Sequence, residues 1–278
     1  MGIVEAFNLI ELSDLDTTCH YIHSAEDLLQ FIRIVRLGPM YRNFLNTSLV
    51  AESFFPSNDF SQTTRLTKDA AHVTWERILS GDWYDLERAV AATGGHSEHT
   101  AAELVVDAAG NVAAVVHTMN TGAWGNTGIF VDGVSIPDIA AWASAAMAIE
   151  GPGNYHYDDI CPCIVLRDGS PVLASGSAGY GLHSVNIQNT YNILAHGMSP
   201  SASMDQPKFL YAWWWGSIPQ RILRGSFGDD VISWIRAQGQ PLEIVDDSGQ
   251  AWAGIKLQHQ DGGIRLLGAT AHGHIDGY

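Results

Sequence analysis

The fold is decided by the stretch TAAELVVDAAGNVAAVVHT, residues 100–118. Apolar residues fill its two halves, and the turn-forming run at 107–111 separates them, which predicts two strands joined in a hairpin. Thr100 opens the first strand. If the chain is cut before Thr100, this residue gains a free α-amine beside its hydroxyl, which supplies a nucleophile together with its base. The pattern alone also fits an ordinary strand threonine that serves only packing.

The same hairpin pattern recurs twice further along the chain. Apolar runs flank turn-forming residues at 164–174 and again at 257–267. Between these two hairpins, apolar residues at helical spacing from Val185 to Leu194 predict a helix that ends at Gly197. The second half of the chain is therefore expected to be rich in antiparallel strands.

Residues 1–99 are predicted to be helical instead. The run Ser24-Ala25-Glu26-Asp27 resembles a capping box, and apolar residues follow it at helical spacing over 28–35. Further helices are predicted at 67–79 and at 84–92. Helices followed by antiparallel hairpins predict an α+β fold in which helices layer on sheets. We expect residues 1–99 and the strand-rich part, residues 100–278, to form one domain together.

The composition limits the partners of the chain. Asp and Glu number 30 against 14 Lys and Arg, and the formal net charge of -16 at pH 7 opposes binding to nucleic acid or to anionic lipid. No stretch approaches the roughly 20 apolar residues that span a bilayer, and no signal peptide is recognisable at the start. We therefore expect a cytoplasmic protein that binds neither nucleic acid nor membrane.

Candidate metal ligands are few. The 3 cysteines fit neither a disulfide framework nor a four-ligand zinc site. His96 with His99 and His272 with His274 form two close pairs, but neither pair has a carboxylate placed beside it. Plain surface histidines are the commoner case, so we expect no metal and no organic cofactor.

Four features together predict a site that cleaves amides. Thr100 is the nucleophile, and the hairpin returns Thr118-Met119-Asn120 on the neighbouring strand, where it orients Thr100. The small-residue run at 176–181 is predicted to be a loop whose backbone N–H groups, at a helix N-terminus, stabilise an oxyanion. Asp158 and Asp159 precede a buried strand. Taken alone, the glycine run also fits a turn or a phosphate cradle, and the aspartates also fit a solvated loop end.

The order and spacing of four runs resemble the small subunit of the gamma-glutamyltransferase family, across roughly residues 95 to 278. The runs are residues 100–111, Thr118-Met119-Asn120, Gly176-Ser177-Ala178-Gly179 and the segment from Asn192 through Phe209. The closing Asp276-Gly277-Tyr278 is also similar to the Gly-Tyr that usually ends proteins of this family.

The resemblance implies an N-terminal nucleophile hydrolase fold, a four-layer αββα sandwich in which self-cleavage before Thr100 releases the active enzyme. Thr100 falls on the nucleophile, whose own amine serves as the base. Thr118 and Asn120 fall on positions that hold the nucleophile and the α-amino or α-carboxyl end of the substrate. Gly179 and Tyr180 fall on the glycine pair whose backbone N–H groups form the oxyanion hole.

The residues that grip a γ-glutamyl group in the family are not recognisable here. After Gly128-Ile129-Phe130-Val131, where the family has a polar amide and an acidic residue, the chain continues with residues 132–138, DGVSIPD. Asp158 and Asp159 align with paired serines and would repel a substrate carboxylate. The resemblance and these departures predict an autoprocessing amide hydrolase or acyltransferase, acting on a small-molecule amide or peptide with a non-glutamyl acyl group.

The start of the chain resembles the last third of the family's large subunit, over residues 2–11 and 24–27. The rest of that subunit has no counterpart in the sequence. Either a separate large-subunit polypeptide supplies it, or the sandwich is incomplete, with unpaired sheet edges and exposed apolar surface. The alternative function is a non-catalytic remnant that keeps the fold and acts as a binding or partner subunit.

Overall fold

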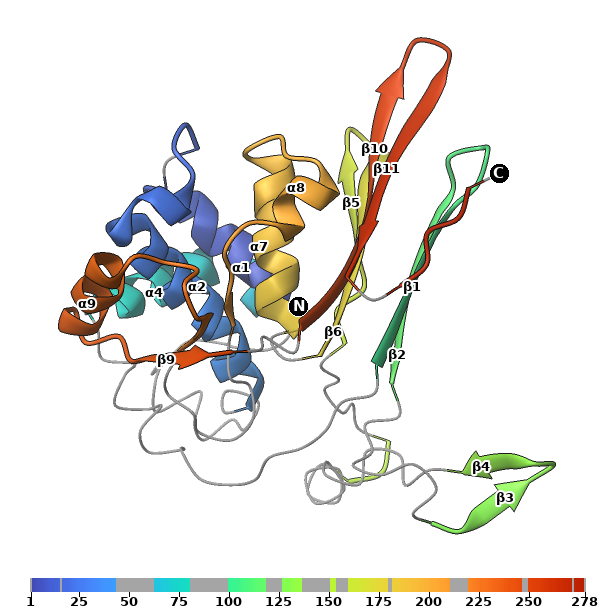
Figure 1. The fold of residues 1–278 in the computed structure, drawn as a ribbon, viewed down its shortest axis with the longest axis horizontal. Coiled ribbons are helices and arrows are strands. Elements are labelled where there is room, and N and C mark those ends of the chain that lie inside the picture. Colours follow the sequence, from blue (N-terminus) through green and yellow to red (C-terminus); the bar gives the residue numbers. More distant parts are fainter. Residues whose placement is uncertain are drawn as a thin grey trace. The chain divides into compact units, whose positions relative to one another are not determined.

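Figure 1 shows the computed structural model of the chain, which combines helices with mostly antiparallel strands. The structure describes residues 2–15, 17–43, 63–80, 100–118, 127–136, 151–153, 160–179, 182–210, 220–246, 250–271 and 273–277. The chain divides into two compact units. The helical unit is Met1–Thr93 with His183–Ser248, and the sheet unit is Gly94–Leu182 with Gly249–Tyr278.

The helical unit contains helices and one small sheet. Its helices are α1 (Gly2–Leu12), η1 (Tyr21–His23), α2 (Ala25–Asn43), η2 (Thr64–Leu66), α4 (Lys68–Ser80), α7 (Leu182–Leu194), α8 (Pro200–Met204) and α9 (Asp229–Ala237). Its strands are β7 (Phe209–Leu210), β8 (Gln220–Leu223) and β9 (Leu242–Val245). β8 lies between the other two, antiparallel to β7 and parallel to β9.

The start of α2 is fixed by Ser24, as the capping-box pattern predicted. The Ser24 hydroxyl accepts a hydrogen bond from the N–H of Asp27 at 3.1 Å. The apolar residues that follow are buried in one core with residues of α1 and α4: Leu28, Leu29, Ile32 and Val35. α4 matches the helix predicted at 67–79 to within one residue at each end. The helix predicted at 84–92 lies outside the described residues.

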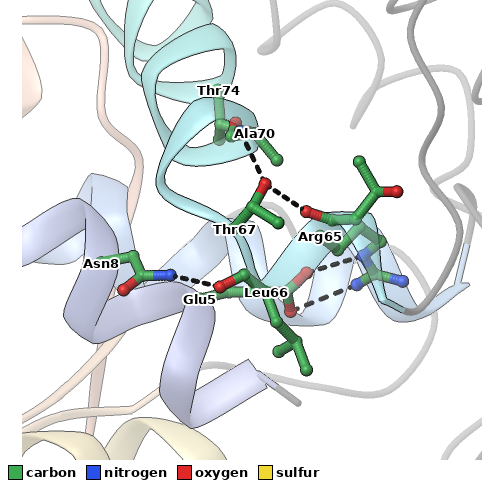
Figure 2. A network of polar contacts seen from close by, with 8 residues as sticks. Glu5, Asn8, Arg65, Leu66, Thr67, Ala70 and Thr74 are labelled. Atoms are coloured by element: carbon green, nitrogen blue, oxygen red, sulfur yellow. Dashed lines mark hydrogen bonds and ion pairs between the residues drawn. The ribbon is translucent and has the colours of Figure 1, made fainter.

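A buried ion pair joins α1 to η2 (Figure 2). Arg65 donates to both carboxylate oxygens of Glu5, with Nε at 2.6 Å from Oε1 and Nη2 at 3.3 Å from Oε2. The two residues are only 4% and 5% exposed, respectively. Burial raises the pKa of Glu5, and the guanidinium of Arg65 opposes that shift. Beside the pair, the side-chain amide of Asn8 donates to the Leu66 carbonyl at 3.1 Å, so polar contacts determine where η2 meets α1.

The sheet unit is built from hairpins. Its strands are β1 (Thr100–Val106), β2 (Val112–Thr118), β3 (Ile129–Val131), β4 (Val134–Ile136), β5 (Cys163–Arg167), β6 (Ser170–Gly179), β10 (Gln250–Gln260) and β11 (Gly263–Thr270). β11, β10, β6 and β5 form one antiparallel sheet in that order, while β1 with β2 and β3 with β4 form two-stranded sheets. All three predicted hairpins are confirmed.

In the glycine-rich run predicted as a loop, residues 176–179 are a strand instead. Residues 176–179 are the end of β6 and pair with β10. Small residues are needed there because a second layer packs closely. A Cβ at Gly176 would lie 2.8 Å from Val116 Cγ2 and 3.1 Å from Ala102 Cβ. Glycine is disfavoured in strands unless another backbone approaches closely, so the local sequence alone favoured the wrong structure.

β1 and β2 pack against β6, so two layers of strands lie face to face in the sheet unit. The opposite face of the hairpin is open, with Val105 59% exposed and Val115 50% exposed. Among the described residues, β1 and β2 pair only with each other. These features agree with the expectation of exposed apolar surface and unpaired sheet edges.

Candidate active site

Thr100 and Thr118 lie directly opposite each other across the β1–β2 hairpin. The prediction that the hairpin returns Thr118 beside Thr100 is therefore confirmed. The turn helps to set this register, because the Asp107 carboxylate accepts hydrogen bonds from the N–H groups of Ala109 and Asn111 at 2.9 and 2.8 Å. Hydrogen bonds from Asn111 and the turn hold the pKa of Asp107 below its ordinary value.

Both threonines belong to the face of the hairpin that packs against β6. Along β1 and β2 the even-numbered residues are less exposed than their odd-numbered neighbours, as expected for strands with one covered face. Ala102 follows Thr100 by two positions and Val116 precedes Thr118 by two, and these are the side chains nearest to Gly176. Because residues two apart share a face, the two threonines point toward the same layer as Ala102 and Val116.

The threonine end of the hairpin is directed toward the C-terminal end of β6. In the hairpin's turn, a Cβ at Gly110 would lie 2.7 Å from Ile264 Cδ1 of β11. Ile264 pairs with His259, whose Nε2 lies 2.8 Å from the Pro171 carbonyl near the start of β6. The turn thus lies toward the start of β6, while Ala102 and Val116, two residues from the open end, lie over Gly176. The open end of the hairpin consequently points toward Gly179.

Gly179 ends β6 in a left-handed conformation with φ of 78°. Such a φ favours glycine, and it turns the chain out of the strand. α7 begins at Leu182, where the sequence predicted a helix to start, and the first N–H groups of a helix have no partner within it. Along the sequence, the end of β6 at Gly179 is therefore followed closely by the start of α7 at Leu182.

Several residues of the predicted site lie outside the described residues: Tyr180, Asn120, Asp158 and Asp159, together with His99 before the predicted cleavage point. Their roles, and those assigned to Thr100, Thr118 and Gly179, stay predictions. The charged side chains of β1 and β2 lie on the outer face instead, where His117 Nε2 is 3.6 Å from Glu103 Oε1.

The other face of β6 carries a polar pair that the sequence did not suggest. The Cys161 thiol lies 3.1 Å from the Ser177 hydroxyl, and both residues are buried. Burial raises the pKa of the neighbouring Cys163 thiol, which keeps it protonated and poorly nucleophilic. The alternation of serine with glycine and alanine over 175–178 was the available signal, because it has the period of a strand.

No group of three His, Cys, Asp or Glu side chains suited to hold a metal ion occurs in the part of the chain that the structure describes. Of the four histidines considered as ligands, His274 is described; its side chain is 88% exposed and lies 4.0 Å from Asp276. Among the helices of the described ranges, none combines the length and the apolar character needed to cross a membrane.

A family model described as Gamma-glutamyltranspeptidase matches residues 43–272, which is most of the chain. The chain belongs to the gamma-glutamyltranspeptidase family. The resemblance carried by the runs around Thr100, Thr118 and Gly179 is therefore confirmed at the level of the family.

Two curated relatives are glutathione hydrolase proenzymes. The protein of Escherichia coli K12 is 25% identical over 168 residues, covering 55% of this chain and 28% of the relative. The protein of Pseudomonas sp. strain A14 is 25% identical over 125 residues, covering 39% of this chain and 21% of the relative. The chain thus spans less than a third of the length of either protein.

Solved structures show the fold. A mutant of Helicobacter pylori gamma-glutamyltranspeptidase superposes with a TM-score of 0.50 at 19% identity, over 62% of this chain and 98% of that chain. The structure LmbA2991HD superposes with a TM-score of 0.70 at 15% identity, over 97% of this chain and 50% of that chain. The α+β sandwich of the N-terminal nucleophile hydrolases is therefore the fold of this chain.

Proposed function

We propose that this chain is the catalytic part of an autoprocessing amide hydrolase or acyltransferase in which Thr100 is the nucleophile. The observation that carries the proposal is the pairing of Thr100 with Thr118, on the covered face of a hairpin whose open end points toward Gly179. Membership of the gamma-glutamyltranspeptidase family supports the same reaction class.

The proposed reaction begins with cleavage of the peptide bond between His99 and Thr100, which frees the α-amine of Thr100. The Thr100 hydroxyl then attacks the substrate carbonyl, and its proton passes to that amine. The N–H groups of Gly179 and Tyr180 stabilise the oxyanion of the tetrahedral intermediate. The C–N bond breaks, the leaving amine takes the proton, and water or an acceptor amine releases the acyl group from Thr100.

Neighbouring residues orient the reactants in this proposal. Thr118 holds the Thr100 hydroxyl from the opposite strand, and Asn120 binds a polar end of the substrate. Asp158 and Asp159 disfavour a substrate carboxylate through like-charge repulsion. The substrate is accordingly a small-molecule amide or peptide whose acyl group is not γ-glutamyl. The reaction needs neither a metal nor an organic cofactor.

A second polypeptide segment is part of the proposal. The chain covers 50% of the LmbA2991HD chain while nearly all of its own length superposes. The exposed face of the hairpin carries Val105 and Val115 beside Glu103 and His117, and partners cover exposed apolar side chains of this kind. The same two observations favour the second candidate function, a non-catalytic family member that acts as a binding or partner subunit.

Intact-mass measurement of the purified protein separates these two functions. We expect two fragments that divide between His99 and Thr100. Thr100→Ala should abolish both cutting and turnover, with a loss of at least about 10³-fold, because alanine has no hydroxyl to act as the nucleophile. Thr100→Ser should retain both in part. A chain that stays uncut, even with a large-subunit partner present, contradicts the catalytic proposal and leaves the binding function.

The orienting role of Thr118 has a matched control beside it. Thr118→Val should lower kcat more than it raises KM, because it removes a group that acts on the nucleophile. His117→Gln changes the adjacent, outward-facing residue and should leave both constants unchanged. Substrate class is measured with a panel of acyl anilides, where turnover confined to the γ-glutamyl compound would contradict the proposed specificity.

A further inference from the structure

Outside the candidate site, His20 lies in a buried polar cluster of the helical unit. His20 is 8% exposed, and its Nε2 lies 2.8 Å from Oδ1 of Asn192 near the end of α7. Its Nδ1 accepts a hydrogen bond from the N–H of Ile22 at 3.4 Å and so caps η1. The ring of Tyr21 lies 4.3 Å away and that of His196 4.7 Å away, centroid to centroid.

The hydrogen bonds specify a neutral imidazole. Nδ1 accepts from a backbone N–H, so it carries no proton, and the proton on Nε2 is donated to Asn192. A second proton on Nδ1 would face the N–H of Ile22, which places donor against donor. Protonation of His20 therefore breaks the contact that caps η1.

The ionisable groups around His20 add to this cost. His23 on the same turn, His196 after α7 and Lys208 before β7 all act against a positive charge on His20. Lys208 is 5% exposed and donates to the carbonyls of Ser203 and Gln206, and Asp205 is the acidic group that acts on it. Burial has the largest effect and, together with these neighbours, lowers the pKa of His20 to about 4. The hydrogen bond to Asn192 acts in the opposite direction and raises the pKa.

Tyr21, the residue next to His20, is part of a buried aromatic core. Tyr21 is 1% exposed, and its ring centroid lies 4.6 Å from that of Phe31 and 6.4 Å from that of Phe209. Burial raises the pKa of Tyr21, and a hydrogen bond with the Asn192 side chain opposes that shift. The contact between His20 and Ile22 therefore holds the turn that places Tyr21 in this core.

We propose that His20 is an acid-operated latch of η1: in its neutral form Nδ1 accepts the N–H of Ile22 and holds the turn, and protonation of Nδ1 breaks that contact while Nε2 keeps its bond to Asn192. The latch is independent of the catalytic proposal, because it involves none of the residues named there. It makes the helical unit sensitive to acid at a single, identifiable contact.

The test compares the unfolding equilibrium of the full chain at pH 7 and pH 4.5 in three forms. The pKa of His20 is about 4 in the folded state and an ordinary 6.5 in the unfolded state. When the pH falls from 7 to 4.5, the unfolding constant of the parent should therefore rise about 10²-fold more than that of His20→Gln. His72→Gln removes an exposed histidine on α4 that is not among the groups acting on His20, and it should behave like the parent. Equal pH dependence in the parent and in His20→Gln would overturn the latch.

A second variant keeps the proposal testable if His20→Gln folds poorly. Asn192→Asp places a carboxylate against Nε2, which should raise the pKa of His20 and remove most of the acid sensitivity assigned to it. Nuclear magnetic resonance of the His20 ring nitrogens in the parent gives a direct measurement. We expect the Nε2-protonated tautomer down to pH 5, with faster exchange of the Ile22 amide below pH 4.5. Titration near 6.5 with no change at Ile22 would overturn the proposal.

Discussion

In the helical unit, separate elements are joined by buried polar and charged side chains, whereas in the sheet unit two layers of strands meet through glycine and alanine. Glu5 with Arg65 joins α1 to η2. In the sheet unit, Gly176 lets Ala102 and Val116 approach β6. The first kind of contact depends on charge and hydrogen bonding and therefore on pH, while the second depends on volume and is indifferent to pH.

The two kinds of contact serve different needs in the two units. A candidate nucleophile needs a fixed backbone position, and close packing of strands provides it without any ionisable group between the layers of β1, β2 and β6. In the helical unit, η1 and α7 meet instead at a directional contact, the hydrogen bond between His20 and Asn192.

Arg65→Ala should destabilise the chain by about 4 kcal/mol, because it leaves the buried carboxylate of Glu5 without its partner. Denaturant unfolding measures the loss. Arg224 and Asp246 form an exposed pair with the same 2.6 Å distance, so Arg224→Ala is the matched control and should not move the transition. Equal effects of the two substitutions would mean that burial of the ion pair does not matter.

Lys208→Met should remove a pH dependence of stability in the alkaline range. Burial lowers the pKa of Lys208 from its ordinary 10.5 to about 7, so the folded state binds fewer protons than the unfolded state between these values. The free energy of unfolding therefore rises with pH, by about 3 kcal/mol from pH 7 to pH 10. Lys68→Met removes an exposed lysine and should keep that rise. A parent that is equally stable at pH 7 and pH 10 would contradict the lowered pKa of Lys208.

Gly176→Val should destabilise the sheet unit by about 2 kcal/mol at every pH, because its side chain overlaps Val116 and Ala102. The comparison predicts parallel curves of stability against pH for parent and variant. Gly277→Val serves as the control, since a Cβ there meets nothing within 4 Å. A pH-dependent loss at Gly176 would show that the two layers are not held by volume alone.

Ser24→Ala should cost about 1 kcal/mol, because the N–H of Asp27 loses its capping partner at the start of α2. Thermal or denaturant unfolding detects a change of this size. Ser24→Gly should cost only a few tenths of that amount, since glycine is a tolerated N-cap residue. If the two substitutions cost the same, the hydroxyl of Ser24 does not stabilise the helix.

The local sequence predicted secondary structure correctly where the apolar residues followed one clear periodicity, either that of a strand or that of a helix. The hairpin at residues 100–118, with its turn at Asp107, and the helix capped at Ser24 formed as expected. The run at 176–179 was predicted wrongly as a loop, because glycine-rich segments are common in loops and the layer that demands glycine there comes from another part of the chain.

The candidate site was predicted in part for the same reason. The residues of one hairpin, Thr100 and Thr118, were placed together by a register that a short turn fixes. No sequence pattern singles out His20, because its partner Asn192 lies 172 positions away and a single histidine in a short turn has no periodicity.

Periodicity, turn residues and the order of motifs are local properties of the chain, and they predicted the hairpins, the helix capped at Ser24 and the family. Tertiary structure alone decided that residues 176–179 extend β6, that Thr100 and Thr118 share its covered face, and that His20 is held neutral. The physical reason is that burial and close approach depend on residues distant in sequence. These long-range contacts set both the volume available at a glycine and the cost of a charge on an imidazole.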